Sequence, residues 1–93
     1  MTVRFVLETS FVYNEGIPLN MELIMRFPLQ SSTISEAVYH PASLILEVCF
    51  HSGHVYRYTG VPKHTVDQFI GADSVGRFYN RWIKGKFPSM RWF

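Results

Sequence analysis

The basic side chains near the C-terminus are the clearest candidates for chemistry in this chain, and that chemistry is the binding of anions. Arg77, Arg81 and Lys84 are spaced i, i+4 and i+7, so on a helix they would line one face about one turn apart. Such a row predicts contact with successive phosphates. The alternative is a solvated helix surface, because cations near a helix C-terminus are favoured without any ligand. The same surface would include three further polar residues, namely Asn80, Lys86 and Arg91.

The distribution of charge along the chain also favours an acidic partner. The net charge is only +2. Residues 1–56 hold two bases against five acids, a charge of −3, whereas residues 57–93 hold seven bases against two acids, a charge of +5. This asymmetry favours a polyanion that meets the C-terminal side of the molecule. RNA is one polyanion of this kind.

A second candidate for binding is the run Tyr56-Arg57-Tyr58, whose alternation on a strand puts two rings on one face and a guanidinium on the other. Exposed, the rings could stack on unpaired bases at about 1–3 kcal/mol per base; otherwise they pack beneath the helices. A two-residue loop at Ser52-Gly53 would turn them away from the apolar face of the sheet. A three-residue loop with a bulge would turn them into the core. The pattern leaves both registers open and favours burial of at least one ring.

The other reactive residues do not form the pattern of a metal site or a catalytic site. Cys49, His51 and His54 form a C-x-H-x-x-H string, but zinc requires three or four convergent ligands and the chain has no second cysteine. Cys49 with His64 lacks a third group that would orient the base and lower the pKa of the thiol. The carboxylates of the C-terminal half are isolated among bases. We therefore expect no metal, no cofactor and no catalytic site.

The elements that would position these residues begin with a sheet. Ile34–Tyr39, Leu44–Phe50 and Val55–Tyr58 read as strands separated by turn residues, which predicts a three-stranded antiparallel meander. In the middle strand four apolar residues alternate onto one face: Leu44, Leu46, Val48 and Phe50. Gly53 would supply the positive φ that the second turn needs.

Two helices are expected after the meander. Pro62 suits the first position of one helix, which Gly71 would end. Asp73 or Ser74 would cap a second helix, and Gly85 would end it. The residues of its apolar stripe must pack on the sheet: Val75, Phe78, Tyr79, Trp82 and Ile83. The tail from Pro88 to Phe93 should be extended. The expected fold class is therefore α+β, with both helices on one face of the sheet.

The first 28 residues form an N-terminal extension in this scheme, ahead of a domain over residues 29–93. Residues 3–8 and 21–27 alternate loosely, and Asn14-Glu15-Gly16 signals a turn between them, which favours a strand or hairpin. The competing interpretation is that Met21 is the true initiator and that residues 1–20 are a dispensable leader.

Composition limits the cellular setting and adds a second class of partner. The single cysteine excludes an intramolecular disulfide, and no apolar run approaches the roughly 18 residues of a membrane span, so we expect a cytoplasmic protein with no membrane partner. Aromatic residues make up 16% of the chain, more than a core of this size easily buries. Surplus rings favour homodimerisation or a protein partner as the alternative to RNA.

A series of short motifs runs in order from Ser31 to about Trp92: Ser31-Ser32-x-Ile34, Tyr39-His40-Pro41, Leu46-Glu47-Val48-x-Phe50 with Ser52-Gly53, Tyr56-x-Tyr58, Val61-Pro62, Ser74-Val75-Gly76-x-Phe78-Tyr79-Asn80-x-x-Ile83-Lys84, and Pro88 with Arg91. Taken together, these motifs resemble the KTSC domain, a family named for its place at the C-terminus of some lysyl-tRNA synthetases. The resemblance implies a small domain, mostly found alone in bacterial and phage proteins. No function is established for the family, and the synthetase fusion suggests binding to tRNA or another structured RNA. This resemblance and the basic face together make RNA the best candidate ligand. This sequence departs from the pattern at His40, where the family tends to have an acid, and in its longer upstream segment.

Overall fold

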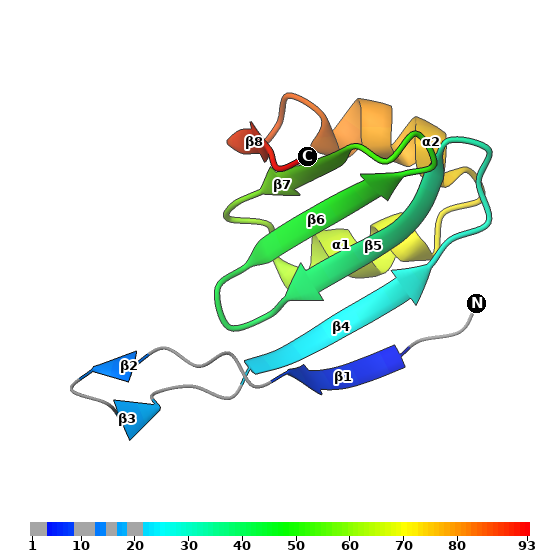
Figure 1. The fold of residues 1–93 in the computed structure, drawn as a ribbon. Coiled ribbons are helices and arrows are strands. Elements are labelled where there is room, and N and C mark those ends of the chain that lie inside the picture. Colours follow the sequence, from blue (N-terminus) through cyan, green and yellow to red (C-terminus); the bar gives the residue numbers. More distant parts are fainter. Residues whose placement is uncertain (1–3, 9–12, 15–16, 19–21) are drawn as a thin grey trace.

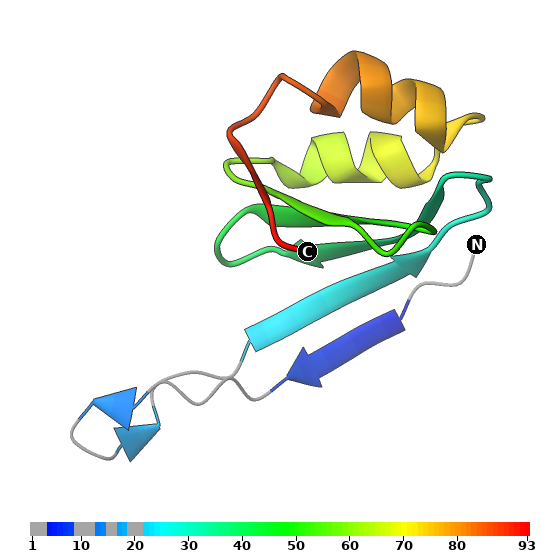
Figure 2. The ribbon, with the colours of Figure 1, turned by 45° about the horizontal axis from the view of Figure 1, so that its top comes forward.

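A computed structural model of the chain describes residues 4–8, 13–14, 17–18 and 22–93. Its main feature is a six-stranded antiparallel sheet with the order β1-β4-β5-β6-β7-β8. Two helices cover one face of the sheet, which confirms the α+β class (Figures 1 and 2). The strands of the sheet are β1 (Arg4–Glu8), β4 (Glu22–Pro28), β5 (Ile34–His40), β6 (Ile45–Phe50), β7 (Val55–Tyr58) and β8 (Ser89–Arg91).

The predicted meander is β5, β6 and β7, with one error at the start of β6. Leu44 was expected to open this strand and to share its buried face, but β6 begins at Ile45. Leu44 lies in the turn before it, exposed and with a φ of 58°. Its carbonyl accepts a hydrogen bond from the Val61 N–H at 2.9 Å, which ties the turn to the segment before the first helix.

The hairpin between β6 and β7 has the three-residue loop, and this decides where the tyrosines lie. The Phe50 N–H donates to the His54 carbonyl at 2.9 Å, and Gly53 has a φ of 96°. The resulting register pairs Val48 with Tyr56 and Leu46 with Tyr58. Partners that lie directly opposite share a face, so both tyrosines point toward the core face of the sheet.

The N-terminal segment joins the sheet. Strand β1 pairs with β4, as the hairpin interpretation predicts. In the sequence between these strands, β2 (Tyr13–Asn14) pairs with β3 (Ile17–Pro18) as a separate two-stranded sheet. The centre of the expected turn, residues 15–16, lies outside the described residues, and so does Met21, the proposed initiator. Strand β4 contributes Phe27 to the core with almost no exposed surface, so this strand is an integral part of the fold.

The first helix, α1 (Lys63–Ile70), begins one residue later than expected, with Pro62 as its N-cap residue, and Gly71 caps its C-terminus. The second, α2 (Val75–Phe78), is capped by Ser74, whose hydroxyl accepts a hydrogen bond from the Arg77 N–H at 3.3 Å. From Tyr79 the chain continues as a π-helical turn, η1 (Tyr79–Ile83), in which the Lys84 N–H donates to the Tyr79 carbonyl at 2.9 Å.

This π-helical turn overturns the expectation that Trp82 packs on the sheet. Trp82 is 51% exposed, whereas Tyr79 and Ile83 are buried. A π-helix turns through a smaller angle per residue than an α-helix because its hydrogen bonds span five residues. Tyr79 and Ile83 therefore align about one turn apart on the sheet side, and Trp82 is rotated into solvent. The Arg81 guanidinium lies 5.2 Å from the centre of its ring.

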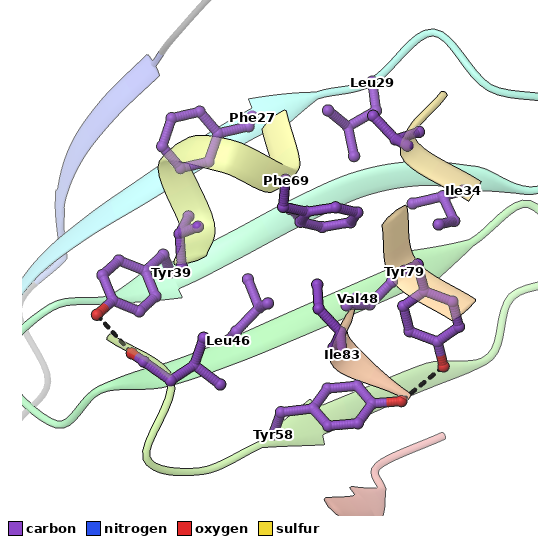
Figure 3. Packing of buried hydrophobic residues seen from close by; sticks show 14 of the residues in the cluster. Phe27, Leu29, Ile34, Tyr39, Leu46, Val48, Tyr58, Phe69, Tyr79 and Ile83 are labelled. Atoms are coloured by element: carbon purple, nitrogen blue, oxygen red, sulfur yellow. Dashed lines mark hydrogen bonds between the residues drawn. The ribbon is translucent and has the colours of Figure 1, made fainter. Parts of the chain in front are cut away.

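The core fills the space between the sheet and the helices (Figure 3). Phe69 of α1 is fully buried there and stacks against Phe78 of α2, with ring centres 5.9 Å apart. Tyr39 is also fully buried, and its hydroxyl donates to the Val61 carbonyl at 2.8 Å. The helices, and with them the basic residues, are thus fixed to the sheet by aromatic packing. Within the described part of the chain, no helix combines the length and apolar character that crossing a membrane requires.

Candidate nucleic-acid interface

Four basic side chains stand on the outside of the α2–η1 segment and just after it. Arg77, Arg81, Lys84 and Lys86 are all exposed, and we refer to them as the cationic surface. None of the four forms an ion pair with a residue in the described ranges. Their charge is therefore not neutralised by the acids of the sheet, which is the condition that phosphate binding requires.

The cationic surface is split between two hollows instead of forming one straight row. Arg77 and Arg81 line a shallow hollow of about 300 Å³ together with Phe78 and Trp82. Lys84 instead lines a more enclosed pocket of about 450 Å³. The π-helical turn accounts for this division, because it changes the angle between Arg81 and Lys84 from that of an α-helix.

The larger hollow, which we call the aromatic pocket, is walled by rings from β6, β7 and η1. Phe50 contacts Tyr56 edge to face, with ring centres 5.9 Å apart, and contacts Tyr79 in the same manner at 5.4 Å. Tyr58 completes the wall, with its ring centre 6.1 Å from that of Tyr79. Edge-to-face contact is a favoured geometry for aromatic rings and fixes these walls relative to one another. The polar residues of its lining are Thr33, Ser52, His54, Asn80, Lys84 and Ser89.

Two tyrosine hydroxyls meet in the wall of this pocket. The hydroxyls of Tyr58 and Tyr79 are 2.6 Å apart and point toward each other in Figure 3. Burial raises the pKa of both side chains above the ordinary value, so both stay protonated at neutral pH. A hydroxyl carries one hydrogen, so this contact uses one of the two hydrogens. Neither hydroxyl has another partner among the described residues.

The two tyrosines that were considered for stacking on bases differ in access, and the expected burial of at least one ring is confirmed. Tyr58 is 2% exposed, so its ring is a packing surface that offers only a small area to the pocket. Tyr56 is partly buried and packs against the edge of the core. Asn80 is exposed and borders the same pocket, where its amide forms no side-chain hydrogen bond within the described ranges.

Two of the predicted binding residues, Arg57 and Arg91, make contacts with other residues of the chain. Arg57 donates to the Glu47 carboxylate at 3.0 Å, and its guanidinium lies 4.3 Å from the centre of the Trp92 ring. Because Arg57 alternates with the tyrosines, it faces the side of the sheet opposite the helices. Arg91 donates to the Phe93 carbonyl at 3.1 Å and lies 2.9 Å from His54 Nδ1. Both guanidinium groups therefore make contacts within the chain, while the buried Nε of Arg57 has no hydrogen-bond partner among the described residues.

The ion pair on that opposite face predicts a pH dependence of stability. The His40 imidazole at 2.8 Å and Arg57 hold the pKa of Glu47 below its ordinary value of 4.5, against the opposing effect of burial. A lowered folded-state pKa stabilises the protein above the unfolded value, and that contribution is lost as pH falls through the folded value. We expect Glu47→Gln to cost about 1–2 kcal/mol at pH 7.

The measurement for Glu47→Gln is urea unfolding at pH 7 and at several values below pH 4.5. The difference between wild type and variant should shrink as the pH falls, because protonation removes the same charge that the substitution removes. A difference that stays constant with pH would mean that the carboxylate charge of Glu47 contributes nothing.

The residues considered for metal binding and nucleophilic chemistry are partly buried or contact the backbone of other segments. Burial raises the pKa of the Cys49 thiol to about 11, so the thiolate is scarce at neutral pH. His51 Nε2 lies 2.9 Å from the Ser31 carbonyl, and His54 contacts the C-terminal segment. Over the described ranges, no three His, Cys, Asp or Glu side chains converge where they could hold a metal ion.

Sequence reasoning missed several residues of the aromatic pocket, above all Phe50, Tyr79 and Gly76. Tyr79 was assigned to the apolar stripe alone, and Phe50 to the core. The signal that could have found the pocket was the hairpin register, since the bulged loop brings Tyr56 to the same face as Phe50. Gly76 was not assigned to a pocket.

Gly76 has no structural need to be glycine. Its φ is not positive, and a Cβ added there would meet nothing nearer than the Thr33 hydroxyl at 3.8 Å, an ordinary contact. Alanine is the better helix former, so Gly76→Ala should stabilise the fold by about 0.5–1 kcal/mol. A thermal melt should show a rise on the order of 4 °C. A lower melting temperature would reveal a steric or backbone demand for glycine at this position.

Comparison with known proteins places this geometry in a family. The model of the KTSC domain matches residues 30–87. The crystal structure of a KTSC domain protein from Yersinia pestis superposes with a TM-score of 0.70 at 38% identity, covering 73% of this chain and 96% of that chain. The superposition supports the antiparallel sheet and the placement of both helices.

Relatives in sequence include both stand-alone proteins and part of a larger enzyme. An uncharacterised protein from Stutzerimonas stutzeri is 46% identical over 59 residues, which is 63% of this chain and 83% of that protein. A lysine–tRNA ligase from Nostoc punctiforme is 36% identical over 67 residues, which is 69% of this chain but only 12% of the ligase. The likeness to the ligase is therefore confined to a small segment of it. Since the family model covers more than half of the sequence, this chain belongs to the KTSC domain family.

Proposed function

We propose that this protein is a non-catalytic RNA-binding module whose cationic surface holds the phosphates of a single-stranded or structured RNA. The observation that carries the proposal is the group of four exposed basic side chains that form no ion pair with any described residue. Arginine and lysine side chains in such a group exchange their counterions for phosphates and give binding without sequence preference.

Trp82 supports RNA as the polyanion in this proposal. Its half-exposed ring stands beside Arg81 and Arg77 in the shallow hollow, so a base and its phosphate could be contacted together. Stacking on an aromatic ring contributes about 1–3 kcal/mol per base. The likeness to a segment of lysine–tRNA ligases makes tRNA the first RNA to test.

The proposal of a non-catalytic role rests on the ionisation of the candidate nucleophiles and bases. Burial raises the pKa of Cys49 to about 11, and it raises the pKa of the tyrosines in the pocket as well. Groups tuned in this direction hold their protons at neutral pH and are poor nucleophiles or general bases.

The direct test is an electrophoretic shift of pooled cellular RNA and of purified tRNA by the protein at low salt. We expect retention of both, because phosphate contacts carry no sequence information. Purification without nuclease should yield protein with a raised ratio of absorbance at 260 to 280 nm. A sample that retains no RNA at low salt would end the proposal.

A protein partner or a homodimer is the second candidate, and the sheet edge at β8 favours it. Met90, Trp92 and Phe93 are large, apolar and exposed along and just after this edge strand. Exposed edges with apolar side chains are common sites of strand addition. Light scattering over a range of concentrations would give a dimer mass in this case, and a monomer at all concentrations would exclude the homodimer.

A further inference from the structure

We propose that the aromatic pocket is a nucleotide site that takes one unstacked base. The size of the pocket is the first argument: its volume of about 450 Å³ lies within the range of roughly 300–1,000 Å³ that small-molecule sites occupy. If the RNA-binding function holds, the base belongs to that RNA; a free nucleotide has the same chemistry and is the other source. The test below separates the two.

The walls of the pocket suit a flat aromatic ligand. Phe50 and Tyr56 meet at an interplanar angle of 90°, and Phe50 and Tyr79 meet at 76°. Rings that meet edge to face form a corner, and such a pair leaves ring surface that its partner does not cover. Unstacked bases are recognised on such surface, by stacking and edge contacts with aromatic side chains.

Polar groups of the pocket match the edge of a base. The Tyr58–Tyr79 hydroxyl pair uses one hydrogen internally and leaves the other without a described acceptor. A carbonyl oxygen or ring nitrogen of a base would accept it. The Asn80 amide offers both a donor and an acceptor at the mouth, and it has no hydrogen-bond partner among the described residues.

The positive charge in the pocket lining favours an anionic ligand. Among the described lining residues, Lys84 carries the fixed charge, His54 is the other basic side chain, and none is an acid. The ammonium group of Lys84 therefore suits a phosphate attached to the base. Lys84 also belongs to the cationic surface, so a chain whose phosphates follow Arg81 and Lys84 would bring one base to the pocket.

Gly76 keeps one wall open. The backbone and the packing both allow a side chain at this position, as its neighbours lie no closer than 3.8 Å to an added Cβ. Gly76 nevertheless borders the pocket, where a larger residue would occupy ligand volume. We therefore expect a larger side chain at this position to reduce the volume open to a ligand.

The experiment is a titration of isotope-labelled protein with nucleoside 5′-monophosphates, followed by backbone amide shifts, with ribose 5-phosphate as the ligand without a base. We expect saturable shifts at Tyr56, Gly76, Asn80 and Lys84 with dissociation constants on the order of 1 mM. Ribose 5-phosphate should bind at least about tenfold more weakly, because it cannot stack. Equal responses to both ligands, or no response at these residues, would overturn the proposal.

Variants sharpen this test. Gly76→Leu should weaken nucleotide binding by at least about tenfold while the spectrum stays that of the folded protein, since stacking accounts for most of the affinity. Asn80→Ala, on an exposed residue, should weaken it about threefold, the worth of a hydrogen bond, and serves if Gly76→Leu does not fold. Lys63→Glu, on α1 and outside both the pocket and the cationic surface, should leave mononucleotide binding within about twofold. Unchanged binding in Asn80→Ala and in a folded Gly76→Leu would contradict the site.

Binding experiments with RNA distinguish the source of the base. They also separate the proposed nucleotide site from the proposed RNA-binding function. An RNA of ten nucleotides should bind Gly76→Leu about tenfold more weakly than wild type, and the salt dependence of its affinity should be unchanged. Pocket shifts with mononucleotides but no retention of RNA would establish a free-nucleotide site and refute the RNA-binding function. Retention of RNA with no pocket shifts would leave that function standing and refute the site.

Discussion

Changing Arg77 and Arg81 together to glutamate lowers the affinity for single-stranded RNA by on the order of a hundredfold at 50 mM salt, and each single change lowers it by about tenfold. Each phosphate contact on a single strand contributes a salt-dependent term with a slope of about 0.7, which is worth close to a factor of ten at this salt concentration. Both guanidinium groups line the same hollow, so the two changes remove neighbouring contacts. Fluorescence anisotropy with a labelled RNA gives the dissociation constants.

Lys63→Glu is the matched control for each single reversal. It changes the net charge by the same amount, but Lys63 lies on α1 and pairs with Asp67 at 3.1 Å instead of belonging to the cationic surface. We expect its affinity for RNA to stay within about twofold of wild type. Equal losses in Arg81→Glu and Lys63→Glu would show that net charge attracts RNA and that the cationic surface is not the docking site.

Truncation of Phe69 to alanine destabilises the fold by about 3–5 kcal/mol, the range found for buried phenylalanines. Phe69 is fully buried between α1 and the sheet and stacks on Phe78 of the next helix. A chain of 93 residues has a total stability of about 5–14 kcal/mol, so the loss is a large fraction of it. Urea unfolding measures the change as a lower midpoint at constant slope.

Phe93→Ala removes an identical side chain from a position that is 71% exposed. Its effect should stay within about 0.5 kcal/mol, as for other surface substitutions. Similar small effects of both truncations would mean that α1 does not pack on the sheet as described. Such a result would also contradict the placement of Arg77 and Arg81, because Phe78, which stacks on Phe69, belongs to the same helical segment as these arginines.

Strand positions could be predicted from the sequence, but the register between strands could not. The alternation of Leu46 and Val48 identifies β6 and its buried face. The turn residues Ser52-Gly53 fit a two-residue loop and a bulged three-residue loop equally well. What selects the bulged loop is a tertiary demand, the burial of Tyr58 against Tyr79, and those residues are far apart in the sequence.

The candidate site could be predicted only in part, for a related reason. The apolar spacing identified the second helix and placed Arg77 and Arg81 on its surface. The same spacing fits an α-helix and the observed change to a π-helical turn at Tyr79, so the exposure of Trp82 and the separate position of Lys84 were not foreseen. The aromatic pocket draws on residues from Thr33 to Ser89, and its assembly depends on the strand order.

The measurement that tests the central claim most directly is the salt dependence of RNA binding by the unmodified protein. If the four bases of the cationic surface each meet a phosphate, the logarithm of the association constant falls against the logarithm of salt with a slope of about −3. Affinity then drops on the order of fifty- to a hundredfold between 50 and 200 mM salt. Affinity that does not change with salt, or no binding at 50 mM, would contradict phosphate docking on this surface.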